Sequence, residues 1–307
     1  MTLGTETTPL QKFCHIPPMP TPTPLISPQA LADRLQQDPD SLALFDCRFN
    51  LAEPQQGQTQ YQAGHLPQAY YLDLNQDLAS PVQRYGGRHP LPDLDQLAET
   101  LARCGVRWGE TWVVAYDASR FAFGSRLWWL LRYMGHDRVL LLDGGIQGWE
   151  ATGLALTTEV PPARSGLFTY QVRPEMAVDV AAVQARKDQP GVVVVDSREA
   201  GRYRGEYEPI DPVAGCIPGA INRVWQEVTT ETGAAQPIDW HQQQWAEVQD
   251  AQEVMVYCGS GVTACVNLFS MALAGLNTGK LYVGSWSDWC ASVLNAPPKG
   301  FEREAKK

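Results

Sequence analysis

The chain has 307 residues, a formal net charge of −10 and a hydrophobic content of 44%. This length predicts two domains of about 100–200 residues each. The negative net charge gives no sign of the basic surface that binds nucleic acid. No apolar run approaches the roughly 18 residues of a membrane span. We therefore expect no nucleic-acid partner and no membrane, and an anionic ligand would need a locally positive pocket.

The cysteines and histidines exclude two further classes. The seven cysteines are an odd number without a C-x-x-C pair, and the five histidines are scattered. Neither a disulfide framework nor a metal site is suggested. The first fifteen residues contain no basic stretch followed by an apolar one, so we expect no secretory signal. A cytoplasmic protein without a bound metal is the simplest expectation.

The first half of the chain alternates short strands with helices. Residues 1–24 are rich in Thr and Pro and predict a disordered lead-in. Ser27-Pro28 predicts the capped start of a helix. The other expected elements are strands over 42–46, 112–117 and 139–143, and helices over 94–104 and 125–134.

The second half repeats the first at an offset of about 140 to 151 residues. Asp46-Cys47-Arg48 corresponds to Asp196-Ser197-Arg198, and the stretch from Trp112 to Asp117 corresponds to that from Glu253 to Cys258. An alternating pattern of this kind predicts an α/β fold in which each half has a central parallel sheet flanked by helices. We expect domains over 25–155 and 176–295, a linker over 156–175 and a tail over 296–307.

The most informative stretch surrounds Cys258. Residues 254–256 predict a buried strand, and Ala264 to Leu273 predict a helix that Gly275 ends. Between them, a loop with two glycines can turn consecutive N–H groups toward one point, next to a helix N-terminus. Such a loop favours an anion, and a thiolate there is a nucleophile. The alternative is that Cys258 is an ordinary core cysteine, which the flanking glycines disfavour.

Two motifs resemble those of a known family. The loop Cys258-Gly259-Ser260-Gly261-Val262-Thr263 is similar to the active-site loop of the two-domain rhodanese family, in its 3-mercaptopyruvate sulfurtransferase form. The stretch Gly284-Ser285-Trp286-Ser287-Asp288-Trp289 resembles the signature that this family carries near its C-terminus. The resemblance covers about residues 25 to 295 and implies two tandem rhodanese-like domains.

The resemblance also implies a reaction. The Cys258 thiolate would take sulfur from a small anionic donor such as 3-mercaptopyruvate, release pyruvate, and pass the sulfur from a persulfide to a thiol or cyanide acceptor. Ser260 would hydrogen-bond the donor or help to move a proton. The backbone N–H groups of the loop would hold the substrate sulfur. These N–H groups belong to Gly259, Gly261, Val262 and Thr263. No metal or organic cofactor is required.

Arg202 is the expected donor-binding group, since the resembling enzymes have an arginine there and a guanidinium suits a carboxylate. One departure concerns the next segment. Glu208-Pro209-Ile210-Asp211 lacks the second arginine that the mercaptopyruvate enzymes usually carry after Glu-Pro. Arg204 and Arg223 are possible substitutes that the sequence does not place. The preferred donor therefore stays open.

The first half is expected to lack the chemistry. Asp117 stands where the second half has Cys258, and an aspartate cannot carry sulfane sulfur. We expect the first domain to be non-catalytic and to help to wall the site. The basic, glycine-rich loop Gly86 to Pro90 could face the cleft, but a plain surface loop is the favoured interpretation.

Three other residues are expected to be structural rather than catalytic. Arg198 is expected to pair with Asp196 or a backbone carbonyl. His65 is expected to be a hydrogen-bonded histidine in a turn. Cys216 replaces the histidine that the family commonly has in the corresponding turn, and it is interpreted as a bystander more readily than as a second redox-active thiol.

Three alternatives to a mercaptopyruvate enzyme remain at this point. Thiosulfate is the second donor candidate, although animal enzymes that use it carry two basic residues where this chain has Gly259 and Ser260. A phosphatase of the strand–loop–helix type needs an arginine at the position of Ala264, which argues against it. A non-enzymatic sulfur carrier or interaction module is the third, because fold alone does not define function.

Overall fold

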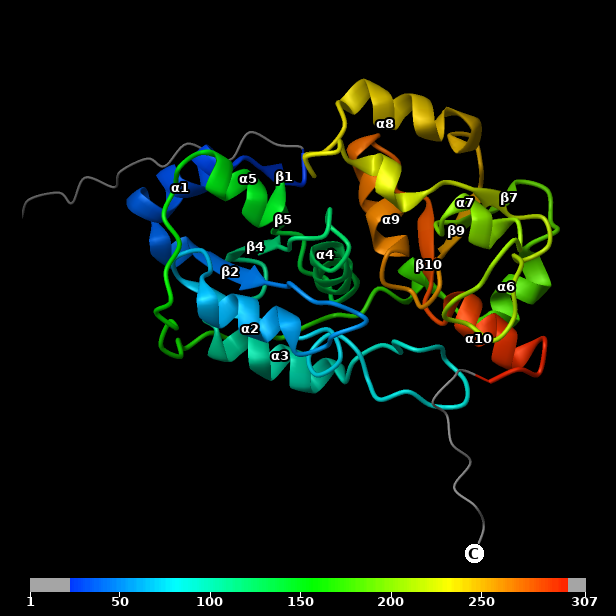
Figure 1. The fold of residues 1–307 in the computed structure, drawn as a ribbon, viewed down its shortest axis with the longest axis horizontal. Helices are drawn as coiled ribbons and strands as arrows, with labels where there is room; N and C mark the ends of the chain where they lie inside the picture. Colours follow the sequence, from blue (N-terminus) through cyan, green and yellow to red (C-terminus); the bar gives the residue numbers. More distant parts are fainter. Residues whose placement is uncertain (1–22, 298–307) are drawn as a thin grey trace, which may run out of the picture.

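Two five-stranded sheets, each with all its strands parallel, organise the molecule (Figure 1). The computed structural model describes residues 23–297. The predicted lead-in and most of the predicted tail therefore lie outside the described residues. The α/β architecture with two parallel sheets flanked by helices is confirmed.

The first sheet has the strand order β1-β5-β4-β2-β3. Helices α1 and α5 cover one face of this sheet, and α3 and α4 cover the other. The elements of this domain are β1 (Leu25–Ile26), α1 (Pro28–Gln37), η1 (Pro39–Ser41), β2 (Leu42–Asp46), α2 (Gln56–Ala63), β3 (Ala69–Tyr71), α3 (Leu94–Arg103), β4 (Trp112–Tyr116), α4 (Gly124–Tyr133), β5 (Val139–Leu142) and α5 (Gly145–Ala151).

The second sheet has the equivalent order β6-β10-β9-β7-β8. Helices α6 and α10 cover one face, and α8 and α9 cover the other. The elements are η2 (Pro174–Met176), β6 (Ala177–Val178), α6 (Val180–Arg186), β7 (Val192–Asp196), α7 (Ala200–Tyr203), β8 (Ile221–Asn222), η3 (Trp225–Val228), α8 (Ile238–Trp245), η4 (Ala246–Val248), β9 (Glu253–Tyr257), α9 (Ala264–Leu273), β10 (Gly279–Tyr282) and α10 (Ser285–Ser292).

Local sequence accounts for several of these boundaries. The Ser27 hydroxyl accepts a bond of 3.3 Å from the Ala30 N–H and caps α1, with Pro28 in the first turn. Helix α9 begins and ends where the sequence predicts. Within residues 23–297, every helix is too short or too polar to span a membrane.

The central strands β4 and β9 occupy the same place in the two sheets. Strand β4 pairs with β2 and β5, and β9 pairs with β7 and β10. Asp117 and Cys258 follow β4 and β9 directly. Because the carboxyl ends of parallel strands open at one edge of a sheet, ligands bind there in open α/β folds. Both loops therefore start at positions suited to a site.

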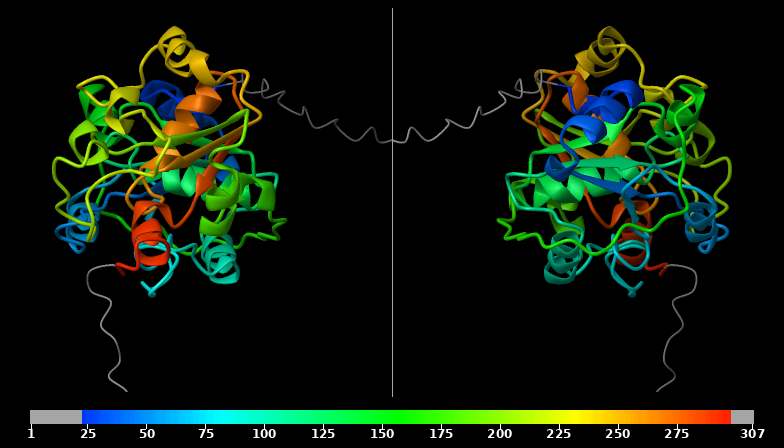
Figure 2. Two further views of the ribbon diagram at one scale, coloured as in Figure 1. Left: turned by 90° about the vertical axis from the view of Figure 1, so that its right-hand side faces the viewer. Right: turned by 90° about the vertical axis from the view of Figure 1, so that its left-hand side faces the viewer.

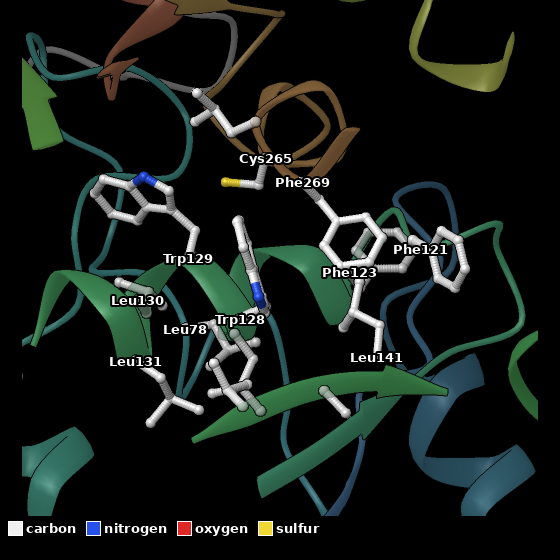
Figure 3. Close-up of a cluster of buried hydrophobic side chains, with 14 of the residues drawn as sticks. Leu78, Phe121, Phe123, Trp128, Trp129, Leu130, Leu131, Leu141, Cys265 and Phe269 are labelled. Atoms are coloured by element: carbon white, nitrogen blue, oxygen red, sulfur yellow. The ribbon is translucent and has the colours of Figure 1, made fainter. Parts of the chain in front are cut away.

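The two domains share one apolar interface (Figure 3). Helix α4 of the first domain packs against α9 of the second. The Trp128 ring meets the Phe269 ring edge-on at 5.2 Å between centroids, and Phe121 lies 5.5 Å from the same ring. Cys265 of α9 is fully buried in this cluster, and burial raises the pKa of its thiol to about 12.

A second contact joins the domains through a loop of the first domain. The segment of residues 80–90, here called the docking loop, leaves the first domain and reaches α10 (Figures 1 and 2). The Gly86 N–H donates to the Asp288 carboxylate at 2.8 Å. A Cβ on Gly87 would lie 2.3 Å from the Gly284 carbonyl oxygen, so the two backbones touch. The favoured prediction of a plain surface loop is therefore wrong, because the glycines allow close backbone approach to the other domain.

Candidate active site

Cys258 lies at the end of the central strand β9 and is 1% exposed. Hydrogen bonds from the first residues of α10 hold the loop that begins at Cys258. The Cys258 N–H donates to the Ser285 hydroxyl at 3.1 Å, and the Cys258 carbonyl accepts from the Trp286 N–H at 3.0 Å. The Gly259 carbonyl accepts from the Ser287 N–H at the same distance. The signature near the C-terminus thus holds the cysteine loop in place.

The inner side of this loop offers unoccupied hydrogen-bond donors. Within the described chain, none of the backbone N–H groups of residues 259–264 donates to an acceptor. Gly261 has φ +77°, and a Cβ there would lie 2.3 Å from the Val283 carbonyl oxygen. Only glycine fits this turn. A buried N–H group without an acceptor raises the free energy of the folded protein. An anionic sulfur at Cys258 would supply the acceptor that these groups lack.

In the equivalent loop of the first domain, a side chain already accepts the hydrogen bonds of the loop N–H groups. Asp117 accepts four backbone N–H bonds of 2.7–3.2 Å, from Ser119, Phe121, Phe123 and Gly124. Its carboxylate therefore occupies the point on which the loop donors converge. Burial raises the pKa of Asp117, and these four bonds oppose that rise. The first-domain loop is closed by its own side chain.

A histidine from the docking loop reaches the cysteine loop. His89 Nδ1 lies 2.7 Å from the Ser260 hydroxyl oxygen. Burial, with smaller contributions from Arg88 and Arg126, lowers the pKa of His89 to about 3. The imidazole is therefore neutral near pH 7, and one of its nitrogens is an acceptor. This histidine was missed from the sequence, although its loop was noted as basic and glycine-rich.

Arg126 places a buried positive charge behind the cysteine loop. It lies on α4, is 0% exposed, and donates to the Gly261 carbonyl at 3.1 Å. Its other acceptors in the described chain are carbonyl oxygens too, those of Leu78, His89 and Pro90 at 3.3–3.4 Å. It also lies over the Trp129 ring, 6.0 Å from the centroid, but no carboxylate of the described chain pairs with it, so no anion balances its charge. From the sequence, Arg126 is predicted only to lie on a helix.

Arg202 lies beside the cysteine loop, already engaged by acidic side chains. Its guanidinium makes two bonds to Glu208, at 3.0 and 2.7 Å, and a contact of 3.3 Å with Asp211. Arg198 forms the predicted structural pair with Asp196, with a shortest distance of 2.6 Å. Both arginines are buried. The sequence did not predict that Glu208 would hold Arg202.

The possible substitutes for the missing arginine lie elsewhere. Arg204 pairs with Glu206, and Arg223 pairs with Glu247. Neither lines the cavity at Cys258. Instead, Arg88 of the docking loop reaches Asp211 from the first domain, with 3.0 Å between Nε and Oδ1.

Cys258, Ser260 and the guanidinium groups of Arg88, Arg198 and Arg202 line one cavity of about 610 Å³ between the domains. Of the predicted site residues, the cavity wall includes Cys258, Gly259, Ser260, Val262, Thr263 and Arg202. Gly261 does not line it and instead forms the turn against Val283. The first domain contributes Arg88 together with the apolar side chains of Phe49 and Leu51. The cavity thus combines a thiol, a hydroxyl and guanidinium groups.

The two turn residues have the environments expected of them. His65 is buried, and its ring nitrogens lie 2.8 and 3.1 Å from the carbonyl oxygens of Tyr61 and Glu159. Cys216 is partly exposed, and burial raises the pKa of its thiol. Neither residue lines the cavity. Their surroundings contain nothing that requires a catalytic role.

Comparison with known proteins identifies the family. The Rhodanese-like domain matches residues 27–152 and 179–292. The chain belongs to the rhodanese family. It is 45% identical over 270 residues to a probable 3-mercaptopyruvate sulfurtransferase of Pseudomonas aeruginosa, covering 86% of this chain and 94% of that relative. It is 34% identical over 279 residues to a putative thiosulfate sulfurtransferase of Mycobacterium tuberculosis, covering 90% and 97%.

A solved structure is similar over most of this chain. The 3-mercaptopyruvate sulfurtransferase from Leishmania major superposes with a TM-score of 0.75 at 28% identity, covering 87% of this chain and 74% of that one. The predicted resemblance to the two-domain rhodanese family is thereby confirmed. The names of the relatives differ in the sulfur donor, which is also where the sequence left the question open.

Proposed function

We propose that this rhodanese is a sulfurtransferase that moves sulfane sulfur from 3-mercaptopyruvate, through a persulfide on Cys258, to a thiol or cyanide. The observation that carries the proposal is the set of unoccupied N–H groups around Cys258. The same loop in the first domain is filled by the Asp117 carboxylate. The catalytic loop is therefore built like an anion site but lacks its own anion, which a thiolate or persulfide supplies.

In the first half-reaction the Cys258 thiolate attacks the thiol sulfur of the donor. An S–S bond forms, the C–S bond breaks, and its electron pair leaves as the enolate of pyruvate. The enolate then takes up a proton, and the persulfide remains on the enzyme. Ser260 lines the cavity together with Cys258, and its hydroxyl oxygen lies 2.7 Å from His89 Nδ1, so this pair is suited to guiding that proton.

In the second half-reaction the acceptor attacks the outer sulfur of the persulfide. The S–S bond breaks, and the electron pair returns to Cys258 as the thiolate. The loop N–H groups and the Arg126 charge stabilise the anionic sulfur in both states. Arg202 is the proposed partner of the donor carboxylate, because its guanidinium lines the cavity next to Cys258.

Thiosulfate is the second candidate donor, and one observation favours it. The residues after the cysteine are the uncharged Gly259 and Ser260, yet Arg88 and Arg202 both line the cavity beside them. Two guanidiniums offer more donors to a dianion than one does, although both are already paired with Asp211 and Arg202 also with Glu208. The Mycobacterium relative is named for thiosulfate, whereas the more similar Pseudomonas relative is named for 3-mercaptopyruvate.

Initial rates with each donor, with cyanide as the common acceptor, test the proposal. We expect thiocyanate formation from both donors, a higher kcat/KM for 3-mercaptopyruvate, and no turnover by Cys258→Ser. A higher kcat/KM for thiosulfate would give the function to the second candidate. Turnover of neither donor would leave a non-enzymatic sulfur carrier.

We also propose a reducing compartment such as the cytoplasm. The cysteines of the described chain are all free thiols, namely Cys47, Cys104, Cys216, Cys258, Cys265 and Cys290. Chemistry that depends on a thiolate and a persulfide is compatible with such surroundings. Localisation of the tagged full-length chain by fractionation tests this expectation.

A further inference from the structure

Two guanidinium groups from opposite domains meet at a single carboxylate. Arg88 comes from the docking loop of the first domain, and Arg202 comes from α7 of the second. Their Nη2 atoms lie 3.4 and 3.3 Å from the same oxygen, Oδ2 of Asp211. Arg88 Nε also donates to Oδ1 at 3.0 Å. Asp211 is fully buried at its side chain and holds the two arginines next to each other.

The two guanidinium groups and the Asp211 carboxylate lie next to Gly259, the residue that follows the reactive cysteine. A Cβ placed on Gly259 would lie 2.8 Å from Arg88 Nη2, 3.5 Å from Arg202 Nη2 and 3.5 Å from Asp211 Oδ2. Both arginines line the cavity that contains Cys258. A donor whose sulfur contacts Cys258 can therefore direct its anionic group toward this pair.

Arg88 has unused hydrogen-bonding capacity there. Its Nε and Nη2 contact Asp211, whereas its Nη1 donates to no acceptor within residues 23–297. Arg202 is more fully occupied, because Glu208 accepts two of its bonds and Asp211 a third. An incoming carboxylate can bind to the free side of Arg88 without displacing an existing partner. Arg88 can therefore bind the anion even while it is paired with Asp211.

The docking loop holds Arg88 in this position. On one side of Arg88, the Gly86 N–H is fixed to Asp288 at 2.8 Å. On the other, the His89 ring is bonded to Ser260, and the His89 carbonyl accepts from Arg126 at 3.3 Å. A side chain anchored on both flanks loses little additional entropy when it binds a ligand. This arrangement is typical of a preorganised binding group.

We propose that Arg88 is a specificity-determining residue that provides the second guanidinium for the anionic group of the sulfur donor. It takes the role left open by the Glu208 to Asp211 segment, which lacks an arginine. Arg202 is the first guanidinium, and Asp211 keeps the pair in register. The donor site is then complete only when the two domains are docked. The inference rests on the proposed function for the identity of the donor, but not for the anion preference itself.

Alkylation of Cys258 by two reagents of nearly equal size tests the anion preference without turnover. Iodoacetate carries a carboxylate, and iodoacetamide is neutral. We expect Arg88→Gln to lower the ratio of the iodoacetate rate to the iodoacetamide rate by roughly 10- to 100-fold, as for the loss of one charge-assisted bond. Peptide mass confirms that Cys258 is the alkylated residue. Arg88→Lys should retain part of the ratio, because it keeps the charge but loses the fork.

Arg120→Gln is the matched control. Arg120 also joins the domains, donating to Thr229 and Gln226 of the second domain, but it does not line the cavity. Its loss should leave the reagent ratio within about twofold. If Arg88→Gln slows both reagents equally, or if Arg120→Gln changes the ratio as much, Arg88 is only an interdomain tie and the proposal is overturned.

Steady-state kinetics then separate this proposal from the proposed function. With 3-mercaptopyruvate, Arg88→Gln should raise KM far more than it lowers kcat, because the lost contact binds the donor. A wild type that does not use 3-mercaptopyruvate would overturn the proposed function while the alkylation ratio still decides the role of Arg88. An unchanged KM in Arg88→Gln, with active wild type, would contradict the role of Arg88 alone.

Discussion

Asp117 and Cys258 occupy corresponding positions at the ends of β4 and β9, but the N–H groups around them differ in their partners. Asp117 binds four of them, whereas the donors around Cys258 have no acceptor in the described chain. In the first domain a carboxylate therefore accepts the hydrogen bonds of the loop N–H groups. In the second domain a reactive sulfur anion is proposed to accept them. The residue that follows the central strand thus decides whether the loop donors are satisfied within the chain.

Replacing Asp117 by Asn should separate stability from activity. An amide offers one acceptor oxygen and turns an NH₂ group toward the remaining N–H donors. We expect the free energy of unfolding to fall by about 1–3 kcal/mol, while the turnover rate of the folded enzyme stays within about tenfold. Urea unfolding and initial rates measure the two quantities. A loss of several orders of magnitude in rate with the fold intact would give Asp117 a part in the chemistry.

His89 and Ser260 should act as a unit, because they share a hydrogen bond of 2.7 Å. We expect His89→Gln and Ser260→Ala each to lower kcat by roughly 10- to 100-fold, and the double variant to lose little more than either one. Single-turnover kinetics with excess donor measure the effect on sulfur transfer. Multiplicative losses would mean that the two side chains act independently.

The sequence predicts the cavity-lining residues of the second domain better than those of the first. Cys258, Ser260 and Arg202 follow short-range signals: a strand, a glycine-rich turn and a family motif. Arg88 and His89 lie about 170 residues away from Ser260 along the chain, and no local pattern indicates that their loop docks. Their contribution depends on how the domains pack, which a single sequence does not encode locally.

Among the elements, the central ones were the most predictable. Strands β2, β4, β5 and β9 are buried apolar runs, and α3, α4 and α9 have clear periodicity or end at a glycine. The edge strands β1 and β6 contain two residues each and were not predicted. Their conformation comes from pairing with β5 and β10, so the signal lies in the partner strand and not in their own residues.

The turn of the cysteine loop should tolerate no side chain at Gly261. An alanine there must keep φ near +77° and would bring its Cβ to 2.3 Å from the Val283 carbonyl oxygen. We expect Gly261→Ala to destabilise the protein by more than about 2 kcal/mol and to lower activity. Gly109→Ala is the matched control, since Gly109 has φ +74° but no atom within 4 Å of its Cβ position.

Gly109→Ala should cost only about 1 kcal/mol, the penalty of the left-handed conformation. Denaturant unfolding compares the two variants. Equal losses would show that backbone strain alone, and not the approach of Val283, requires glycine in the cysteine loop.

At the scale of the molecule, the interface makes two domains into one enzyme. The cluster around Trp128 and Phe269 aligns α4 with α9 (Figure 3), and the docking loop adds a second contact between the domains. The first domain, which has Asp117 in place of the reactive cysteine, thus supplies His89, Arg88 and the Arg126 charge. The duplication visible in the sequence predicted two domains, but it did not indicate how strongly the second depends on the first.

Buried histidines should make the stability of the molecule depend on pH. Burial lowers the pKa of His89 to about 3 and that of His241 to about 4. The unfolded chain takes up protons below about pH 6.5, whereas these native side chains stay neutral until pH 3–4. Their contribution is therefore favourable above the unfolded pKa and is lost as the pH falls.

We expect the midpoint of thermal unfolding to decrease from pH 7 to pH 5, and His241→Gln to reduce that slope. His241 is bonded to Ser270 and to the Gln236 carbonyl, so the variant should also be less stable at pH 7. Thermal unfolding monitored by circular dichroism at several pH values measures both effects. A slope that is the same in the variant would assign the pH dependence to other groups.

The covalent intermediate on Cys258 is the central claim, and intact and peptide mass spectrometry test it directly. The protein is incubated with 3-mercaptopyruvate without an acceptor, and the peptides are analysed under non-reducing conditions. We predict the mass of one sulfur atom added to the peptide that contains Cys258, and its loss when cyanide is supplied. Sulfur found on another cysteine, or continued turnover by Cys258→Ser, would contradict the account.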